Sequence, residues 1–138
     1  MTPRELIYNA IKKLIYDDKF KFKYSDMDAL SEMTCAIYVR SGKSPTHREF
    51  DGEYLTRNAS VLFRVNSSKG LDGIRQGDEF CEQIFQKMQT CFNYVFTDDE
   101  GNSITIIKTD AMGDINDLGK NEKGTKMYSL NFNISYGG

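Results

Sequence analysis

Histidine and cysteine, the residues that most often carry nucleophilic chemistry, are sparse in this sequence. The single histidine is His47, and the three cysteines are Cys35, Cys81 and Cys91. A Cys–His nucleophile pair needs an accessible thiol in an electropositive setting. Cys35 and Cys81 instead stand in apolar patterns, where a free cysteine behaves as a small hydrophobic residue. We therefore predict no catalytic residues. Because three cysteines cannot all form disulfides with one another, we also favour a reducing compartment for the protein.

Metal and cofactor sites are not indicated either. One histidine cannot build the usual zinc site, and no Cys-x-x-Cys or His-x-x-x-His spacing occurs. The acidic segment 110–122 suggests calcium, but its aspartates do not follow the alternate-position ligands of an EF-hand. The segment Gly70–Gly73 lacks the glycine and lysine spacing of a phosphate loop. We predict no metal ion and no cofactor, and we interpret the acidic segment as a solvated loop.

Lysines alternate with aromatic residues from Lys19 to Tyr24. Such alternation is found in binding grooves for single-stranded nucleic acid, where cationic side chains contact the phosphates and aromatic side chains stack on the bases. It is also found in edge strands, whose charged side chains block further strand pairing. We favour the edge strand, since the chain has a formal net charge of −2 and offers no long-range attraction to nucleic acid.

Length and composition indicate one folded domain spanning residues 1–138. The hydrophobic fraction is 39% and the charged fraction 28%, as in globular proteins. A chain of this length suits a single domain. The first apolar residues recur at helical spacing and are interrupted by Lys12 and Lys13, so we expect no signal peptide. No apolar run reaches the roughly 18 residues of a membrane span.

Two helices are expected, over residues 2–17 and 71–90. Thr2 can cap the first helix, Pro3 suits its first position, and Glu5 can complete a capping box. Each helix has an apolar stripe at steps of three and four. The stripes are Leu6, Ile7, Ala10, Ile11, Leu14 and Ile15, then Ile74, Gly77, Cys81, Ile84, Phe85 and Met88 with Phe80 on the flank. The glycine in the second stripe indicates close packing.

Alternating apolar and polar residues predict strands at 34–40, 53–66, 92–97, 103–109 and 128–136. The apolar faces of the two longest strands consist of Leu55, Ala59, Val61, Phe63 and Val65, and of Tyr128, Leu130, Phe132, Ile134 and Tyr136. Arg57 interrupts the first of these faces. Gly101 favours a hairpin between the third and fourth strands. Glycine and proline are expected to exclude regular structure from Ser41–Asp51, and Ala111–Gly124 is expected to be a long loop.

These elements predict an α+β fold. The simplest packing is a two-layer sandwich, in which a twisted, mainly antiparallel β-sheet carries both α-helices on one face. The opposite faces of the two long strands are rich in Asn, Ser and Thr and nearly free of charge. Depletion of charge is common at the centre of protein interfaces, but an ordinary solvated sheet face has the same composition.

The central segment carries a family resemblance. An apolar strand at Ala36–Val39 precedes Ser41-Gly42-Lys43-Ser44-Pro45 and Phe50-Asp51-Gly52, and a long strand ending Val61-Leu62-Phe63-Arg64-Val65 precedes an amphipathic helix. This order resembles the minor capsid and tail-terminator family of long-tailed, siphovirus-type bacteriophages. The resemblance covers about residues 1–95 and is tightest over 36–65. Lys43 stands where a second glycine is common in that family.

The resemblance implies a virion structural protein and not an enzyme. Tail terminators form a ring, usually a hexamer, at the head-proximal end of the tail tube. The ring stops tube growth and contacts the tail tube protein and a head-completion or connector protein, while DNA passes through its lumen unread. Such a protein would be assembled in the host cytoplasm and found at the tail–neck junction of the virion, without a membrane. The alternatives are a head-completion or connector protein of the neck, or an unrelated small α+β ligand-binding domain or enzyme.

The two expected loops are the candidate contacts with other subunits or partners. Residues 1–48 contain nine Lys and Arg against six Asp and Glu, whereas residues 98–124 contain three against seven. Complementary charge on different parts of one subunit suits a head-to-tail ring, although two solvated faces would look alike. The candidate interface residues are Ser41, Gly42, Lys43, Pro45, Arg48, Phe50, Asp51, Asp110, Asp114, Asp117 and Glu122.

Overall fold

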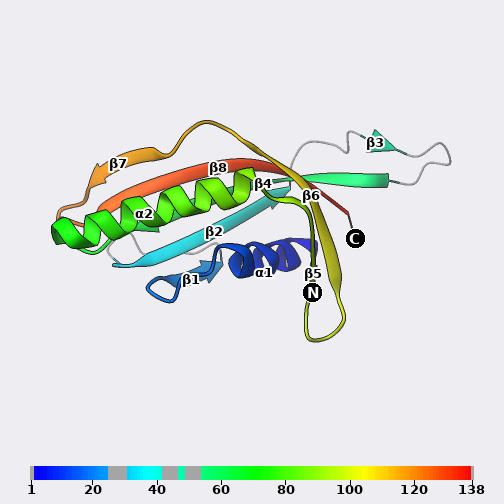
Figure 1. Ribbon diagram of the computed structural model, residues 1–138, viewed down its shortest axis with the longest axis horizontal. Helices are drawn as coiled ribbons and strands as arrows, with labels where there is room; N and C mark the ends of the chain where they lie inside the picture. The colour runs from blue at the N-terminus through cyan, green and yellow to red at the C-terminus, as the bar shows by residue number, and fades with distance from the viewer. Residues whose placement is uncertain (1, 25–30, 42–46, 49–53, 138) are drawn as a thin grey trace.

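The structure is a computed structural model that describes residues 2–24, 31–41, 47–48 and 54–137, with the backbone alone at 47–48 and 54–56. Within these ranges the chain forms two helices and eight strands (Figure 1). In chain order they are α1 (Pro3–Ile15), β1 (Lys21–Tyr24), β2 (Thr34–Ser41), β3 (His47–Arg48), β4 (Tyr54–Asn66), α2 (Gly70–Gln89), β5 (Phe92–Thr97), β6 (Ser103–Ala111), β7 (Asn116–Lys120) and β8 (Lys126–Gly137).

All eight strands belong to one sheet, ordered β1-β2-β4-β8-β6-β5, with β3 on β4 and β7 on β8. β1 runs parallel to β2, and every other pairing is antiparallel. The sheet is therefore mixed, and it curls around the helices (Figure 1). α1 reaches both ends of it, since the ring of Tyr8 lies 5.0 Å from that of Tyr24 on β1 and the hydroxyl of Tyr94 on β5 donates to the carbonyl of Ala10 at 3.2 Å. The predicted α+β class is confirmed.

The start of α1 follows the predicted capping in part. The carboxylate of Glu5 accepts from the hydroxyl of Thr2 at 3.1 Å, whereas the predicted capping box needs a bond from the backbone N–H of Thr2. The hydroxyl oxygen of Thr2 accepts a hydrogen bond from the backbone N–H of Glu5 at 3.2 Å, and Pro3 is the first helical residue. This capping satisfies one of the backbone donors that a helix start leaves unpaired. Ile7, Ala10, Ile11 and Ile15 are buried, as the stripe predicts.

The predicted faces of the two longest strands are confirmed. Val61 on β4 is the register partner of Phe132 on β8, and both are fully buried, whereas Asn131 and Asn133 are exposed. A shift of one residue would have exchanged these faces. The side chain of Leu55 lies outside the described residues.

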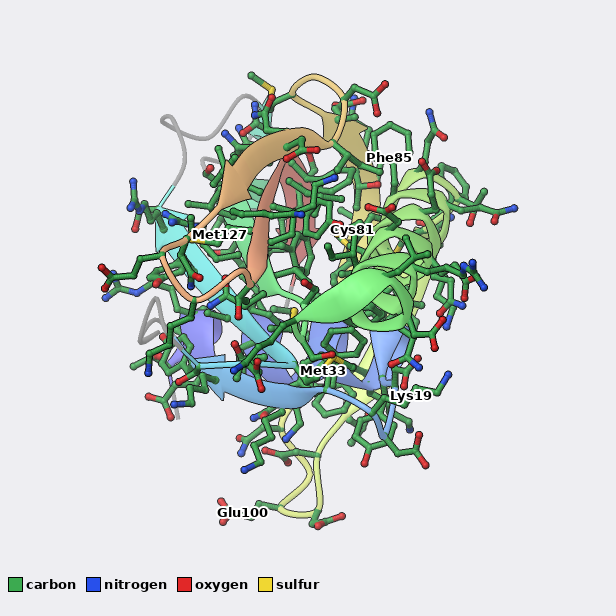
Figure 2. The ribbon with its side chains drawn as sticks, turned by 90° about the vertical axis from the view of Figure 1, so that its left-hand side faces the viewer. Lys19, Met33, Cys81, Phe85, Glu100 and Met127 are labelled. Atoms are coloured by element: carbon green, nitrogen blue, oxygen red, sulfur yellow. The ribbon has the colours of Figure 1, made fainter. Side chains whose placement is uncertain are left out.

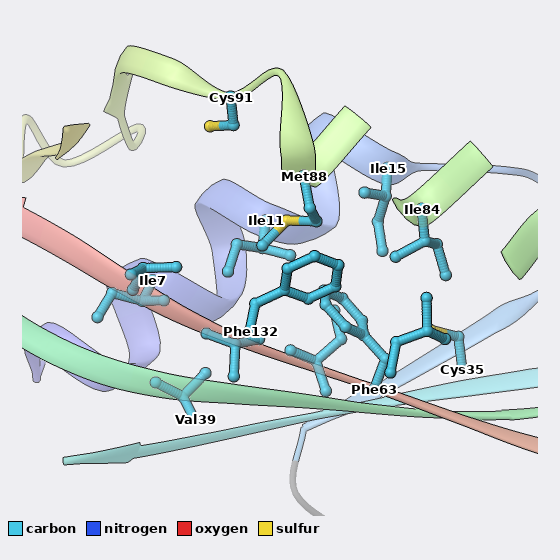
Figure 3. Close-up of a cluster of buried hydrophobic side chains, with 14 of the residues drawn as sticks. Ile7, Ile11, Ile15, Cys35, Val39, Phe63, Ile84, Met88, Cys91 and Phe132 are labelled. Atoms are coloured by element: carbon cyan, nitrogen blue, oxygen red, sulfur yellow. The ribbon is translucent and has the colours of Figure 1, made fainter. Parts of the chain in front are cut away.

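The core lies between the inner face of the sheet and the two helices (Figure 3). Phe132 is at its centre, with its ring 5.8 Å from the rings of both Phe63 and Phe85. Ile11 of α1 and Met88 of α2 approach the same cluster and are fully buried. Phe80, predicted on the flank of α2, is instead buried and stacks on Phe20 at 4.1 Å. The flank position is buried because the curled sheet brings the start of β1 over that side of the helix.

Gly77 has the close packing that the sequence predicts. A Cβ atom there would lie 2.8 Å from the Cβ of Ser67 and 3.1 Å from a ring carbon of Tyr128. The absence of a side chain therefore lets α2 approach the end of β4 and the start of β8.

Two loop predictions are wrong. The segment Ser41–Asp51 contains the two-residue strand β3, in which His47 pairs with Thr56 and Arg48 with Tyr54. The segment Ala111–Gly124 contains β7, which continues the line of β6 along β8 after a four-residue interruption at 112–115. β7 has no buried face that would create alternation, because it is held by backbone pairing with β8 at the margin of the sheet. Gly119, with φ of +82°, lies at the register shift within β7, and Gly124, with φ of +84°, lies in the turn before β8.

Candidate functional site

The first group of candidate interface residues surrounds β3. Ser41 is the exposed last residue of β2, and the backbone of Arg48 pairs with Tyr54. Gly42, Lys43, Pro45, Phe50 and Asp51 lie outside the described residues. Of this group the structure therefore places only Ser41 and the backbone of Arg48.

The second group lies along the β6–β7 arm. Asp110 is near the end of β6, Asp114 is in the interruption, Asp117 is in β7, and Glu122 is in the turn before β8. All four side chains are exposed. The structure thus brings the four acidic residues to one margin of the sheet, although the segment is not a loop.

Part of this acidic charge is compensated within the molecule. The carboxylate of Asp110 is 3.9 Å from Nζ of Lys108, and that of Asp117 is 2.6 Å from Nζ of Lys126. The hydrogen bond from Lys126 and a second from the N–H of Gly119 lower the pKa of Asp117. The same contact with Asp117 raises the pKa of Lys126. Asp114 accepts from the N–H of Ile115 at 2.7 Å. Glu122 is thus the acidic residue of this group whose charge has the least compensation in the described contacts.

The outer face of the sheet is the surface opposite the helices. Its central residues, on β2, β4 and β8, are Tyr38, Asn58, Ser60, Leu62, Asn131, Asn133 and Ser135. The two helices cover only the inner face (Figure 1). Neighbouring strands are joined on the outer face by neutral hydrogen bonds, from Ser60 to Asn131 at 3.4 Å and from Ser135 to Asn58 at 3.2 Å. Tyr38 and Leu62 are register partners in the middle of this face. The centre of the outer face is thus apolar, and charged residues lie around it: Arg40 and Arg64 follow Tyr38 and Leu62 on the same face, and Lys108 and Asp110 are the register partners of Ser135 and Asn133.

A groove of about 720 Å³ separates α1 from the hairpin β5–β6. Lys12, Lys13 and Tyr16 line one wall, and residues 96–100 line the other. The pKa of Asp98 in this wall is lowered, first by the side-chain amide of Asn102 and then by backbone N–H groups. Those donors belong to the hairpin turn itself. The perturbed carboxylate therefore holds the turn and does not indicate a ligand.

A second, smaller hollow of about 220 Å³ lies where the first turn of α1 meets the ends of β2 and β4. We call it the arginine pocket, because Arg4, Arg40 and Arg57 line it together with Thr2, Pro3, Ser41, Ala59 and Tyr136. Arg57 lies over the ring of Tyr136, 5.7 Å from its centre. Sequence reasoning missed this pocket, since its arginines are far apart in the chain. The only signal was Arg57, a charged residue in an otherwise apolar strand face.

The thiols lie in apolar surroundings. Cys35, Cys81 and Cys91 are all buried, and burial is the largest cause of the raised pKa of each. A raised pKa disfavours the thiolate, which is the nucleophilic form. The side chain of His47 is not described. Within the described ranges no three His, Cys, Asp or Glu residues come together as metal ligands, and no helix has the length and apolarity to cross a membrane.

Comparison of the sequence with protein-family models and with curated proteins gives no match.

Proposed function

We propose that this chain is a bacteriophage tail terminator. In this proposal, identical subunits form a ring, with six members as the expected number, at the head-proximal end of the tail tube. The ring stops tube growth and joins the tail to the head-completion or connector protein, and DNA crosses its lumen without being read. The protein would act in the virion, at the tail–neck junction, after assembly in the host cytoplasm.

The observation that carries the proposal is the order of elements in the central segment. β2, the Gly- and Pro-containing segment after it, the long strand β4 and the amphipathic helix α2 follow one another as in the family that residues 36–65 resemble. As part of the same proposal we regard the curled sheet and the helices as the two layers of a sandwich. The layers would leave the outer face of the sheet open for a partner.

The composition of the outer face supports a contact role. Its strands present hydroxyl and amide groups around Tyr38 and Leu62, and the half-buried pair lies in register across β2 and β4. An apolar centre with a polar surround is the usual composition of a protein interface, and Arg40 and Arg64 add positive charge beside Tyr38 and Leu62. The tail tube protein or a connector protein is the partner class that the proposal assigns to it.

The test is the native mass of the purified protein, measured by light scattering, together with negative-stain images. A closed ring with a central hole, of a mass near six subunits, is the expected result. A chain that stays monomeric at all concentrations, and that neither caps purified tail tubes nor joins tails to heads, would contradict the proposal. A ring that binds heads but leaves tube length unregulated would favour the connector alternative.

A further inference from the structure

The arginine pocket brings three arginines together, and none of them forms an ion pair with a carboxylate in the part of the chain that the structure describes. The carboxylates that form ion pairs in the described part of the chain are Asp72, Asp110 and Asp117, and their partners are Arg75, Lys108 and Lys126. None of these lines the pocket, and the described residues that line it include no acidic side chain. Guanidinium groups stay charged at every physiological pH and favour carboxylate or phosphate oxygens as partners. The pocket therefore has the chemistry of an anion site.

The pocket has room for a small anionic group only. Its volume of about 220 Å³ is less than a third of the volume of the groove beside the hairpin, about 720 Å³. One or two carboxylate side chains fit such a space, and a folded segment does not. Its wall contains Arg57 above the ring of Tyr136, so the aromatic ring holds this guanidinium in place. An arriving carboxylate would thus meet at least one positioned partner.

The same chain presents exposed carboxylates on a projection. The hairpin β5–β6 extends away from the body of the molecule, with Glu100 at its tip (Figure 2). Asp99 and Glu100 are exposed and lie outside the ion pairs of the described residues. Asp98 has a different role, because its carboxylate accepts from the N–H groups of Glu100 and Asn102 and holds the turn rigid. Gly101 completes the turn with φ of +86°.

The pocket and the groove beside the hairpin border different parts of α1. Residues of its first turn line the arginine pocket, whereas Lys13 and Tyr16, near its other end, face the hairpin across the groove. Two different surfaces that complement each other on one subunit allow a head-to-tail contact. Such contacts close into rings when the rotation between subunits permits.

We propose that the arginine pocket of one subunit binds the carboxylates of Asp99 and Glu100 of a neighbouring copy of this chain. This inference rests on the proposed ring, and it assigns the negative side of the contact to the hairpin tip and not to the acidic residues of segment 110–122. Arg4 and Arg57 supply the charge that the tip meets. The contact is electrostatic and therefore weakens with salt.

A charge exchange tests the contact. The pocket variant carries Arg4→Glu and Arg57→Glu, and the tip variant carries Asp99→Lys and Glu100→Lys. In either variant alone, like charges face each other at every contact, so the concentration for half-assembly should rise roughly tenfold or more. An equimolar mixture should recover assembly, because alternation of the two variants restores opposite charges at both kinds of contact. Sedimentation velocity reports assembly, and circular dichroism reports the fold.

Matched controls use arginine and glutamate on the exposed side of α2. Arg75→Glu and Glu79→Lys change the same charges away from the pocket and the tip, and they should leave assembly unchanged. If either charge-reversed variant does not fold, Arg57→Gln and Glu100→Gln replace it, with a smaller loss of assembly expected for each.

The outcomes separate this contact from the ring itself. Rings that form equally well from the variants, or a mixture that does not recover, would overturn the contact and leave the proposed function standing. Pocket-dependent assembly into filaments or pairs would support the contact and contradict the ring. A wild-type chain that never associates would overturn both. If the pocket variant assembles normally but loses binding to a short DNA duplex, measured by fluorescence anisotropy, the pocket takes phosphates and the contact is rejected.

Discussion

Lys126 of β8 lies with its Nζ 2.6 Å from the carboxylate of Asp117 on β7 and 5.4 Å from the ring centre of Tyr128. The hydroxyl of Tyr128 in turn donates to the carboxylate of Asp78 on α2. These contacts join the sheet margin, the central strand and the helix in one line of polar groups. Tyr128 is almost fully buried, and burial is the first cause of its raised pKa, followed by the bond to Asp78.

Replacement of Asp117 by asparagine should reduce the stability of the β7–β8 pairing and flatten its acid dependence. The pKa of Asp117 in the folded chain is lower than its ordinary 3.8. A group with a depressed folded pKa stabilises the fold above its unfolded pKa, and this stabilisation is lost as pH falls through the folded pKa. Thermal unfolding at about pH 6 and about pH 3 measures the effect. Asp110→Asn, in the longer contact with Lys108, is the control with a smaller change.

Gly77→Ala should destabilise the fold although alanine is the better helix former. Alanine gains about 1 kcal/mol in a helix over glycine, but its Cβ would meet Ser67 and Tyr128 at 2.8 and 3.1 Å. Overpacking of this kind typically costs about 1–3 kcal/mol, so we expect a net loss in the free energy of unfolding in urea. Gln76→Ala, at the exposed neighbouring position, should change it by no more than about 0.5 kcal/mol. An increase in stability for Gly77→Ala would show that α2 can move away.

Phe132→Ala should lower the free energy of unfolding by about 3–5 kcal/mol. Its ring is fully buried between Phe63 and Phe85, so truncation leaves a cavity at the centre of the core. Phe92→Ala is the matched control, because this side chain is 71% exposed on β5. Its change should lie within about 0.5 kcal/mol of zero. Equal losses for the two phenylalanines in urea titrations would contradict the described core.

Asn102→Ala should raise the pKa of Asp98 toward 3.8, because the amide of Asn102 is the largest cause of the depression. The side-chain nitrogen of Asn102 donates to Asp98 at 3.0 Å and its backbone N–H donates at 2.8 Å. The variant keeps the backbone donor, so part of the depression should remain. Carboxyl carbon shifts followed by NMR during acid titration measure the pKa. Asn121→Ala, in the turn before β8, should leave the Asp98 titration unchanged.

Replacement of residues 114–123 by a tight turn should destabilise the folded chain. β7 within this segment pairs with β8, and Ile115 packs against the core. A segment that were only a solvated loop could be shortened at little cost. Circular dichroism and urea unfolding report the fold, and sedimentation reports assembly. A shortened variant with wild-type stability would show that β7 adds nothing to the sheet.

The elements with a buried face were predictable from the sequence. β4 and β8 alternate apolar and polar residues because one face of each strand contacts the core. The apolar residues of the helices, such as Ile7, Ile11 and Ile84, recur at helical spacing for the same reason. β7 could not be found in this way, because Leu118 is its only large apolar residue and is itself exposed. The parallel pairing of β1 with β2 leaves no sequence pattern either, since the direction of pairing depends on how the connecting segment runs.

The candidate site was less predictable than the fold. Charge counts indicated positive and negative segments, but not that Lys108 and Lys126 compensate Asp110 and Asp117. The arginine pocket combines residues from one helix and two strands, and proximity of this kind follows only from the curl of the sheet. The sequence showed that Arg57 interrupts an apolar strand face, but it did not show that Arg4 and Arg40 lie near Arg57.

The strand order also governs when the sheet can form during synthesis. Val61 of β4 cannot pair with Phe132 of β8 until Phe132 has been synthesised, and Phe132 follows Val61 by 71 positions in the sequence. At translation rates of about 5–20 residues per second, the hairpin of β2 and β4 exists for several seconds with one long edge open. An open apolar hairpin is a binding site for chaperones and for other nascent chains. The central place of β8 therefore makes a ribosome-bound chain that has not yet reached Lys126 the species most exposed to aggregation.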